Sequence, residues 1–134
     1  VGNFRDIEVE DLTKHKTDSE EMEITQEACD IINTAKAERN KVFAVGTTTL
    51  KALETAVAIS GQINPFKGWT NKFIFPHYDF NTANALITNF HLPKSPMMME
   101  VAAFAGYELL MEAYKVAVEE KYRFFTYGDA MLIL

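Results

Sequence analysis

The sequence has few of the residues that cross-link or interrupt a chain: its 134 residues include one cysteine, four prolines and one tryptophan. A single cysteine, Cys29, excludes an internal disulfide and fits a reducing cytosol. Its place in an apolar helical pattern indicates a packing role rather than a nucleophile. The sequence also shows no signal-peptide pattern and no apolar run near the roughly 20 residues that a membrane span needs. We therefore expect a cytoplasmic protein without a membrane partner.

Basic residues are scarce as well. Lysine and arginine number 13 against 19 aspartates and glutamates, for a formal net charge of −6, and acidic residues gather between Asp6 and Asp30. This balance argues against a stand-alone nucleic-acid-binding domain. A hydrophobic content of 48% is enough to build a core. The length suits one compact domain or part of a larger one. Because the chain opens at Val1 rather than at a methionine, we expect a fragment.

The most informative stretch is 83–106, in which apolar sequence is interrupted by a few polar residues. Residues 85–87 predict a short buried strand, and residues 97–105 predict a helix that is apolar apart from Glu100. A helix that is apolar on every side must be enclosed by protein. The polar residues Asn89, His91 and Ser95 lie between the strand and the helix, beside Pro93 and Pro96. In open α/β sheets ligands bind at this position. The alternative is an ordinary connection whose polar side chains only satisfy backbone groups.

A second strand-to-helix junction follows a buried strand predicted at residues 41–45. Gly46 and three threonines lead directly into a helix that we expect to stop near Gly61. Backbone N–H groups at a helix start, helped by the hydroxyls of Thr47 and Thr48, can hold an anion or a carboxylate. The passage lacks the lysine and spaced glycines of a Walker loop. Ordinary helix capping by Thr47 or Thr48 is the alternative.

The remaining pattern mixes strands and helices along the whole chain. We expect strands at 1–4, 21–24, 72–75 and 122–125, a helix from its cap at Thr25 to 39, an amphipathic helix around 109–117 and a loop at 63–68. Alternation of this kind predicts an α/β layered domain with some parallel strand pairs. No linker-like composition divides residues 1–134.

Five sequence blocks in one order, together with VGNFRDIEVEDLTKHKTDSE at 1–20, point to a known family. They are VGTTTLKALE at 45–54, GWTNKFIFP at 68–76, ALITNFHLPKS at 85–95, AFAGYE at 103–108 and YRFFTYGDAML at 122–132. Together they resemble the carboxyl-terminal part of the S-adenosylmethionine:tRNA ribosyltransferase-isomerase family. The resemblance implies a three-layer α/β/α fold with a mixed sheet, incomplete because the amino-terminal part and a separate β-barrel domain are absent. Residues 1–134 would then be the carboxyl-terminal part of the catalytic domain.

The resemblance also implies an activity. Enzymes of this family transfer and isomerise the ribosyl unit of S-adenosylmethionine onto the aminomethyl-deazaguanine wobble base of tRNA. Epoxyqueuosine is formed, and adenine and methionine leave. The resemblance implies S-adenosylmethionine as co-substrate, no metal, and tRNA as a partner through the full-length protein. We expect the fragment alone to be inactive and to self-associate through unpaired strand edges.

The residues in the matching blocks are candidates for the chemistry. His91 is the expected acid–base group because an imidazole titrates near neutral pH, and Asp129 is the second expected catalytic residue. Further residues are expected to bind substrate or S-adenosylmethionine: Thr47, Thr48, Lys51, Asn89, Ser95, His15 and Glu20. For each of them the alternative is a structural or solvated side chain.

The sequence departs from the family pattern near these motifs. The family has methionine, histidine and arginine where this chain has Thr17, Asp18 and Lys51, and it has glycine and threonine at His77 and Pro96. These changes keep a second interpretation open, a diverged paralogue that binds a nucleoside or a protein without turnover. A third interpretation is an ordinary methyltransferase, although no glycine-rich loop follows a first strand here.

Overall fold

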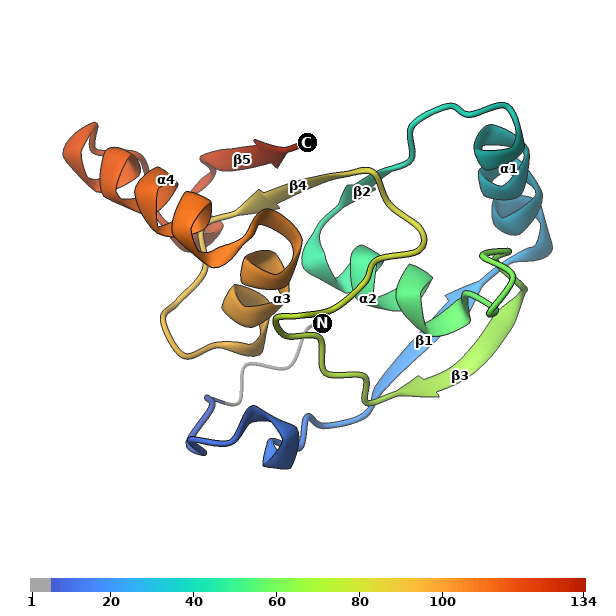
Figure 1. Ribbon diagram of the computed structural model, residues 1–134, viewed down its shortest axis with the longest axis horizontal. Coiled ribbons are helices and arrows are strands. Elements are labelled where there is room, and N and C mark those ends of the chain that lie inside the picture. Colours follow the sequence, from blue (N-terminus) through green and yellow to red (C-terminus); the bar gives the residue numbers. More distant parts are fainter. Residues whose placement is uncertain (1–5) are drawn as a thin grey trace.

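The structure is a computed structural model that describes residues 6–134, so the strand expected at 1–4 lies outside the described residues. The elements run along the chain in the order η1 Leu12–Lys14, β1 Glu20–Ile24, α1 Gln26–Ala37, β2 Phe43–Val45, α2 Thr47–Ala56, β3 Phe66–Thr70, β4 Ala85–Asn89, α3 Pro96–Ala105, α4 Tyr107–Glu119, η2 Phe125–Tyr127 and β5 Ala130–Ile133 (Figure 1).

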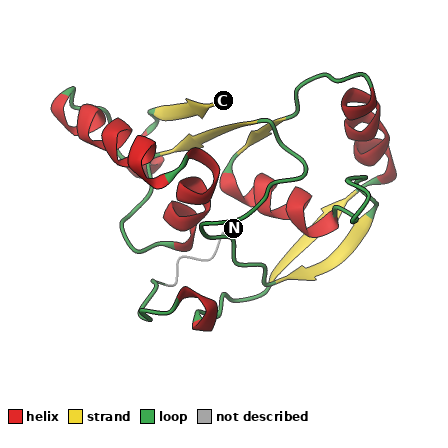
Figure 2. Ribbon diagram, viewed as in Figure 1, coloured by secondary structure: helices red, strands yellow, loops and turns green. Residues whose placement is uncertain are grey.

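The strands form two separate sheets (Figure 2). The larger sheet has the order β2-β4-β5, with β2 parallel to β4 and β5 antiparallel to β4. The smaller sheet is the antiparallel pair of β1 and β3, in which Ile24 lies opposite Phe66. A parallel pair needs a crossover of helix length, and here α2 supplies part of the connection between β2 and β4. The expected α/β fold with a mixed sheet is confirmed.

Helices α2 and α3 lie together on one side of the larger sheet (Figure 1). Their buried side chains join the strands in one hydrophobic cluster, whose members include Leu50, Leu53, Leu86, Val101 and Leu110. The fully apolar helix predicted at 97–105 is enclosed as expected, since no residue from Pro96 to Ala105 is exposed.

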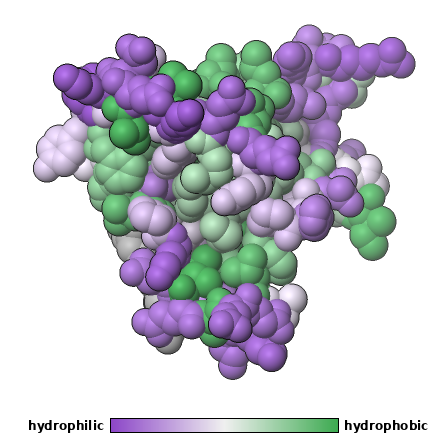
Figure 3. Space-filling model, turned by 60° about the vertical axis from the view of Figure 1, so that its left-hand side comes forward, coloured by the Kyte–Doolittle hydropathy of each residue, from purple (hydrophilic) through white to green (hydrophobic). Residues whose placement is uncertain are grey.

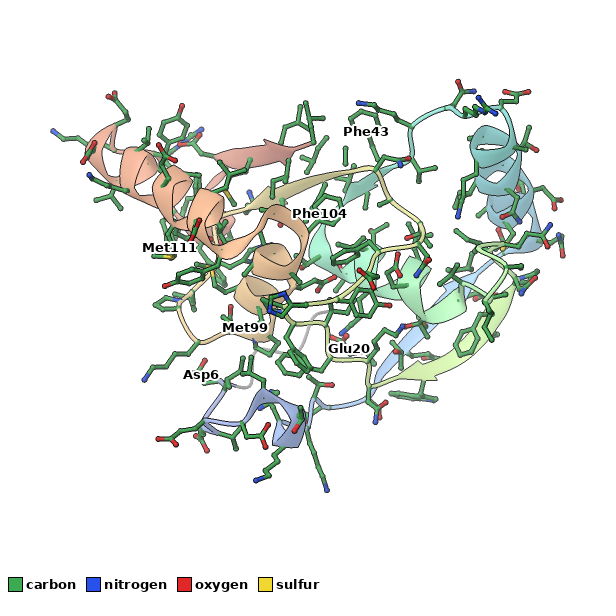
Figure 4. The ribbon with its side chains drawn as sticks, viewed as in Figure 1. Asp6, Glu20, Phe43, Met99, Phe104 and Met111 are labelled. Carbon is green, nitrogen blue, oxygen red and sulfur yellow. The ribbon has the colours of Figure 1, made fainter. Side chains whose placement is uncertain are left out.

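The opposite side of the larger sheet carries apolar side chains on its surface. Phe43 is 48% exposed, Val45 64% and Leu132 56%, and Figure 4 shows Phe43 pointing away from α2. The register places Val45 and Leu132 on either side of Ile87. The prediction of a wholly buried strand at 41–45 was therefore wrong, because within β2 only Ala44 is buried.

Two predicted strands are displaced. Residues 72–75 form no regular element, and the strand instead covers Phe66–Thr70, which begins inside the loop expected at 63–68. The ladder with β1 ends where Glu20 meets Thr70, and the Thr70 hydroxyl then accepts the Lys72 N–H. Residues 122–125 also form no strand: Phe124 is extended but unpaired in a ladder, η2 begins at Phe125, and the Asp129 carboxylate accepts the backbone N–H of Arg123. The strand follows at Ala130–Ile133.

One helix ends earlier than predicted, and another buries a different set of side chains. Helix α2 stops at Ala56 rather than near Gly61, and Val57 instead bridges to Ile63. In α4, Leu110 and Ala117 are buried, whereas Leu109 and Val116, which were expected on the same apolar side, are exposed and line an open groove beside β5. Figure 3 shows apolar patches between hydrophilic side chains on the side of the molecule that carries α4.

Local predictions at α1 were confirmed. Thr25 caps the helix, with its hydroxyl accepting the Ala28 N–H. Cys29 is fully buried in the hydrophobic cluster, as its packing role requires, and burial raises the pKa of its thiol.

Candidate functional site

The two strand-to-helix junctions lie at the same edge of the larger sheet. Strands β2 and β4 are parallel, with Val45 opposite Ile87 at their carboxyl ends. The Gly46 N–H donates a hydrogen bond of 2.8 Å to the Ile87 carbonyl and so ties the first junction to the second strand. Because carboxyl ends of neighbouring parallel strands share an edge, the segments that follow β2 and β4 start close together.

Helix α2 begins without a side-chain cap. Its N-cap is Gly46, in the left-handed region at φ +90°, and among residues 6–134 no side chain makes a capping hydrogen bond there. Thr47 and Thr48 lie inside the first turn, so the capping alternative for these two threonines was wrong. The first N–H groups of a helix have no partner within it and favour negative charge. The start of α2 therefore has the donors that a carboxylate requires.

A small hollow lies where α2 meets α3. We name it the α2–α3 hollow and define it by the residues that line it: Thr17, Thr47, Thr48, Lys51, Lys72, Phe73, Ile74, Pro96, Met97 and Glu100. Three threonines supply hydroxyl groups, and two lysines and a glutamate supply side chains of both charges. The hollow brings together predicted residues of the first junction with the start of the helix that follows the second.

Lys51 and Glu20 are brought together as an ion pair beside this hollow. The Lys51 ammonium contacts the Glu20 carboxylate, and both side chains are only 14% exposed. Figure 4 shows Glu20 at the start of β1, near α2. Burial lowers the pKa of Lys51, and the nearby charge of Glu100 opposes that shift. The structure thus gives the site a fixed cation on its α2 side.

Glu100 is the most unusual group in the hollow. It is 5% exposed, and within residues 6–134 its Oε1 has no hydrogen-bond partner. Burial raises the pKa of Glu100 to about 8, while the charge of Lys51 opposes the shift and that of Glu54 adds to it. A buried carboxyl oxygen without a partner is costly and uncommon in native structures.

A second buried carboxylate, Glu54, is satisfied. Its Oε1 accepts the backbone N–H groups of Asn81 and Thr82 at 3.0 and 2.9 Å as well as the Thr82 hydroxyl. Its Oε2 accepts the hydroxyl of Tyr78, whose pKa burial and Glu54 together raise. Glu54 therefore holds the connector between β3 and β4 in place.

His91 is buried beside α4, and it is not among the residues that line the α2–α3 hollow. Its Nε2 lies 2.7 Å from the Thr88 hydroxyl, and its backbone N–H donates to the Tyr114 hydroxyl, also at 2.7 Å. Burial lowers the pKa of His91 to about 4, so the ring is neutral at neutral pH. Its acid–base role stays a prediction.

Asn89 and Asp129 meet at the carboxyl end of β4. The Asn89 side chain donates 3.0 Å to the backbone carbonyl of Asp129, because Asn89 pairs with Ala130 in the adjacent strand. The Asp129 carboxylate accepts hydrogen bonds from the backbone and guanidinium of Arg123, which lower the pKa of Asp129. The carboxylate is thus engaged in holding a turn.

Two further predicted residues have local partners. The Ser95 hydroxyl accepts the Met98 N–H and donates to the Leu92 carbonyl, which makes it the cap of α3. The His15 ring packs on Phe73, with centroids 4.9 Å apart. The departure at Thr17 lines the hollow, and that at Pro96 occupies the first turn of α3, where proline is well tolerated.

Sequence reasoning did not select Glu100, Lys72 or Glu54 as site residues. A signal existed for Glu100, which is the one charged residue in the apolar run at 97–105. Lys72 donates to the Glu54 carbonyl at 2.6 Å and to the Tyr78 hydroxyl at 2.9 Å. These contacts join separate segments of the chain, so no local sequence pattern predicts them.

In the part of the chain that the structure describes, no three His, Cys, Asp or Glu side chains gather in a way that could hold a metal ion. The expectation that no metal takes part stays a prediction. Likewise, no helix among residues 6–134 combines the length and the apolar character needed to cross a membrane.

Comparisons with known proteins identify the family of the chain. Residues 1–133 match the family described as "Queuosine biosynthesis protein". The S-adenosylmethionine:tRNA ribosyltransferase-isomerase of Flavobacterium psychrophilum is 57% identical over 134 residues, and that of Phocaeicola vulgatus is 60% identical. Each alignment covers 100% of this chain but only 38% of the relative, so the chain spans about two fifths of their length.

A solved structure is also similar. The crystal structure of S-adenosylmethionine tRNA ribosyltransferase from Thermotoga maritima superposes with a TM-score of 0.78 at 45% identity, covering 84% of this chain and 39% of that one. The family match over nearly the whole chain, the high identities and the shared fold agree. The chain belongs to the family of queuosine biosynthesis proteins.

Proposed function

We propose that this chain is the carboxyl-terminal part of the catalytic α/β domain of an S-adenosylmethionine:tRNA ribosyltransferase-isomerase. The whole enzyme would transfer and isomerise the ribosyl unit of S-adenosylmethionine onto the aminomethyl-deazaguanine wobble base of tRNA, giving epoxyqueuosine and releasing adenine and methionine. The α2–α3 hollow supports this proposal most directly, because it joins an uncapped helix start to charged side chains in a protein of this family.

The residues at the start of α2 fit the methionine end of S-adenosylmethionine, which supplies the ribosyl unit. N–H groups of the first turn, at Thr47 and Thr48, would hold the carboxylate, and Lys51 would add a positive charge. Because Glu20 pairs with Lys51, the lysine side chain is held in one position rather than moving freely.

The residues at the carboxyl end of β4 would contact the reacting groups of the nucleobase and the ribose. His91 would be the acid–base group at this edge, and its contacts with Thr88 and Tyr114 restrain its position. Asn89 would contact a base edge or a ribose, and Asp129 would act beside it, since the two residues are joined by a hydrogen bond. Ser95 and His15 would complete the contacts to substrate.

The partners follow from the same proposal. The tRNA would be held by the full-length protein, since this chain carries a formal net charge of −6. We place the enzyme in the cytoplasm, and S-adenosylmethionine would act as co-substrate without a metal. The isolated fragment would be inactive and would self-associate.

Adenine release by the intact protein, with substrate tRNA present, tests the proposal. We expect His91→Ala and Asp129→Ala each to lower the rate by orders of magnitude, and Lys51→Ala to raise the KM for S-adenosylmethionine. Lys115→Ala is a matched control, because Lys115 is an exposed lysine of α4 with only a long contact of 4.0 Å to Glu119. Near wild-type rates for both His91→Ala and Asp129→Ala would defeat the assignment of these residues.

The departures from the family pattern support one alternative. Thr17, Lys51 and Pro96 all line the α2–α3 hollow. In a diverged paralogue that binds a nucleoside or a protein partner, these substitutions would change the residues that contact the ligand. An intact wild-type protein that binds S-adenosylmethionine but releases no adenine would favour this alternative. Methylated product without adenine would favour a methyltransferase instead.

A further inference from the structure

Glu100 has the features of a ligand-binding group rather than a structural one. It lies one turn into α3 and is only 5% exposed. Its side chain lines the α2–α3 hollow. Its Oε1 has no partner among residues 6–134, whereas both oxygens of the neighbouring Glu54 accept hydrogen bonds. Folding leaves one acceptor of Glu100 unused, and a bound donor would satisfy it.

The groups around Glu100 define what that donor is. The opposite wall of the hollow is the uncapped start of α2, with Thr47, Thr48 and Lys51, which favours an anion. The Glu100 carboxyl group facing an anion-binding helix start suits a ligand end that carries one negative and one positive group, because a bound cation would favour the ionised form of Glu100. An α-amino acid carries both groups on one carbon.

We propose that Glu100 accepts a hydrogen bond from the α-ammonium group of the methionyl part of S-adenosylmethionine, whose α-carboxylate lies at the start of α2 beside Lys51. The identity of the ligand rests on the proposed function. Glu100 is then a specificity-determining residue, which selects S-adenosylmethionine over molecules of the same shape that lack the amine. The other primary amine of the reaction, on the substrate base, has the same chemistry, and the experiment must tell the two apart.

Three charged side chains lie near Glu100. Lys51 and Glu54 come from α2, and Lys72 comes from the connector after β3. The Lys72 ammonium donates to the Glu54 carbonyl and the Tyr78 hydroxyl, and the Lys51 ammonium pairs with Glu20. Both lysines are thus engaged elsewhere, and an incoming ammonium would complete the contacts of the free oxygen.

The test compares two ligands on the intact protein by titration calorimetry. One ligand is S-adenosylmethionine, and the other is its deamino analogue, in which hydrogen replaces the α-amino group. We expect Glu100→Gln to weaken S-adenosylmethionine roughly tenfold or more, as for a lost charge-assisted hydrogen bond. The deamino analogue should bind wild type and variant equally.

Glu54→Gln is the matched control, because it removes the other buried carboxylate near the hollow. If Glu54→Gln changes the affinity for S-adenosylmethionine, it should change the affinity for the deamino analogue by the same factor. Thermal unfolding establishes that both variants are folded at the titration temperature.

Several outcomes would overturn the proposal: no binding of S-adenosylmethionine by the wild type, unchanged affinity in Glu100→Gln, or equal weakening of both ligands. A raised KM for tRNA with unchanged affinity for S-adenosylmethionine would assign Glu100 to the amine of the base instead. Failure of the proposed function is seen separately, as absence of adenine release by the wild type. Glu100-dependent selection of the amine would still stand in that case.

Discussion

The hydroxyl of Thr88 lies 2.7 Å from Nε2 of His91, and both residues are buried where β4 ends. The chain thus keeps a titratable ring in a closed environment next to a neutral partner. Burial lowers the pKa of His91 from 6.5 to about 4. In the unfolded chain the ring would take up a proton below about pH 6.5, and this difference couples stability to pH.

His91 should stabilise the fold above pH 6.5 and lose that contribution as the pH falls toward 4, because the unfolded state then binds the extra proton. A pKa change of this size corresponds to about 3 kcal/mol at most. Chemical denaturation of the intact protein and of His91→Gln at pH 7.5 and 4.5 measures it. The free energy of unfolding of the wild type should fall more steeply than that of the variant. Equal pH dependence in both proteins would contradict the prediction.

Glu100 should make the stability of the fold decrease as the pH rises, whereas His91 makes it decrease as the pH falls. Its pKa rises from 4.5 to about 8 on folding, so the folded protein loses stability as the pH rises through that window, when the unfolded carboxyl ionises and the folded one does not. Glu100→Gln cannot ionise, and it should gain stability over wild type between pH 4.5 and 8, by a few kcal/mol at most. Denaturation curves at both pH values test this. A constant difference between the two proteins would contradict it.

Gly46→Ala should weaken both the fold and ligand binding. Gly46 has φ +90°, and an added Cβ would meet only the Thr48 hydroxyl at 3.8 Å, so the expected cost comes from backbone strain rather than a clash. We expect a loss of about 1–2 kcal/mol and a raised Kd for S-adenosylmethionine, because the start of α2 shifts.

Gly106→Ala is the control for this substitution, since Gly106 has nearly the same conformation at φ +85°, with no heavy atom within 4 Å of an added Cβ. It joins α3 to α4. Denaturation and titration calorimetry together should show a similar loss of stability for Gly106→Ala but an unchanged Kd. A matching loss of affinity in both variants would speak against a ligand at the start of α2.

Besides the strand edges expected from sequence, the exposed apolar face of the larger sheet should let the isolated chain 1–134 self-associate. Val45 and Leu132 are more than half exposed there, and exposed apolar strands favour pairing between copies. Sedimentation velocity should show a concentration-dependent oligomer for the chain and a monomer for Val45→Lys. Val118→Lys, on an exposed position of α4, should leave the oligomer intact. A monomeric wild-type fragment would refute the prediction.

Part of the site was predictable from sequence. The alternation of strands and helices predicted some parallel strand pairs, and β2 and β4 form such a pair. Tertiary structure decided that these two strands are neighbours and that the segments after them start at one edge of the sheet. The capping role given to Thr47 and Thr48 as an alternative was wrong, because Gly46 provides the N-cap. The strand predicted at 72–75 was wrong because pairing with β1 ends at Thr70, and a ladder partner decides where a strand stops.

Patterns that depend on neighbours within a turn or two were enough to place α1, β4 and α3 and to recognise the family, since caps, periodicity and motif blocks are local. Charge environments depend instead on which distant segments pack together. The unsatisfied oxygen of Glu100, the neutral ring of His91 and the ion pair of Glu20 with Lys51 arise only when helices and strands far apart in the chain exclude water around them.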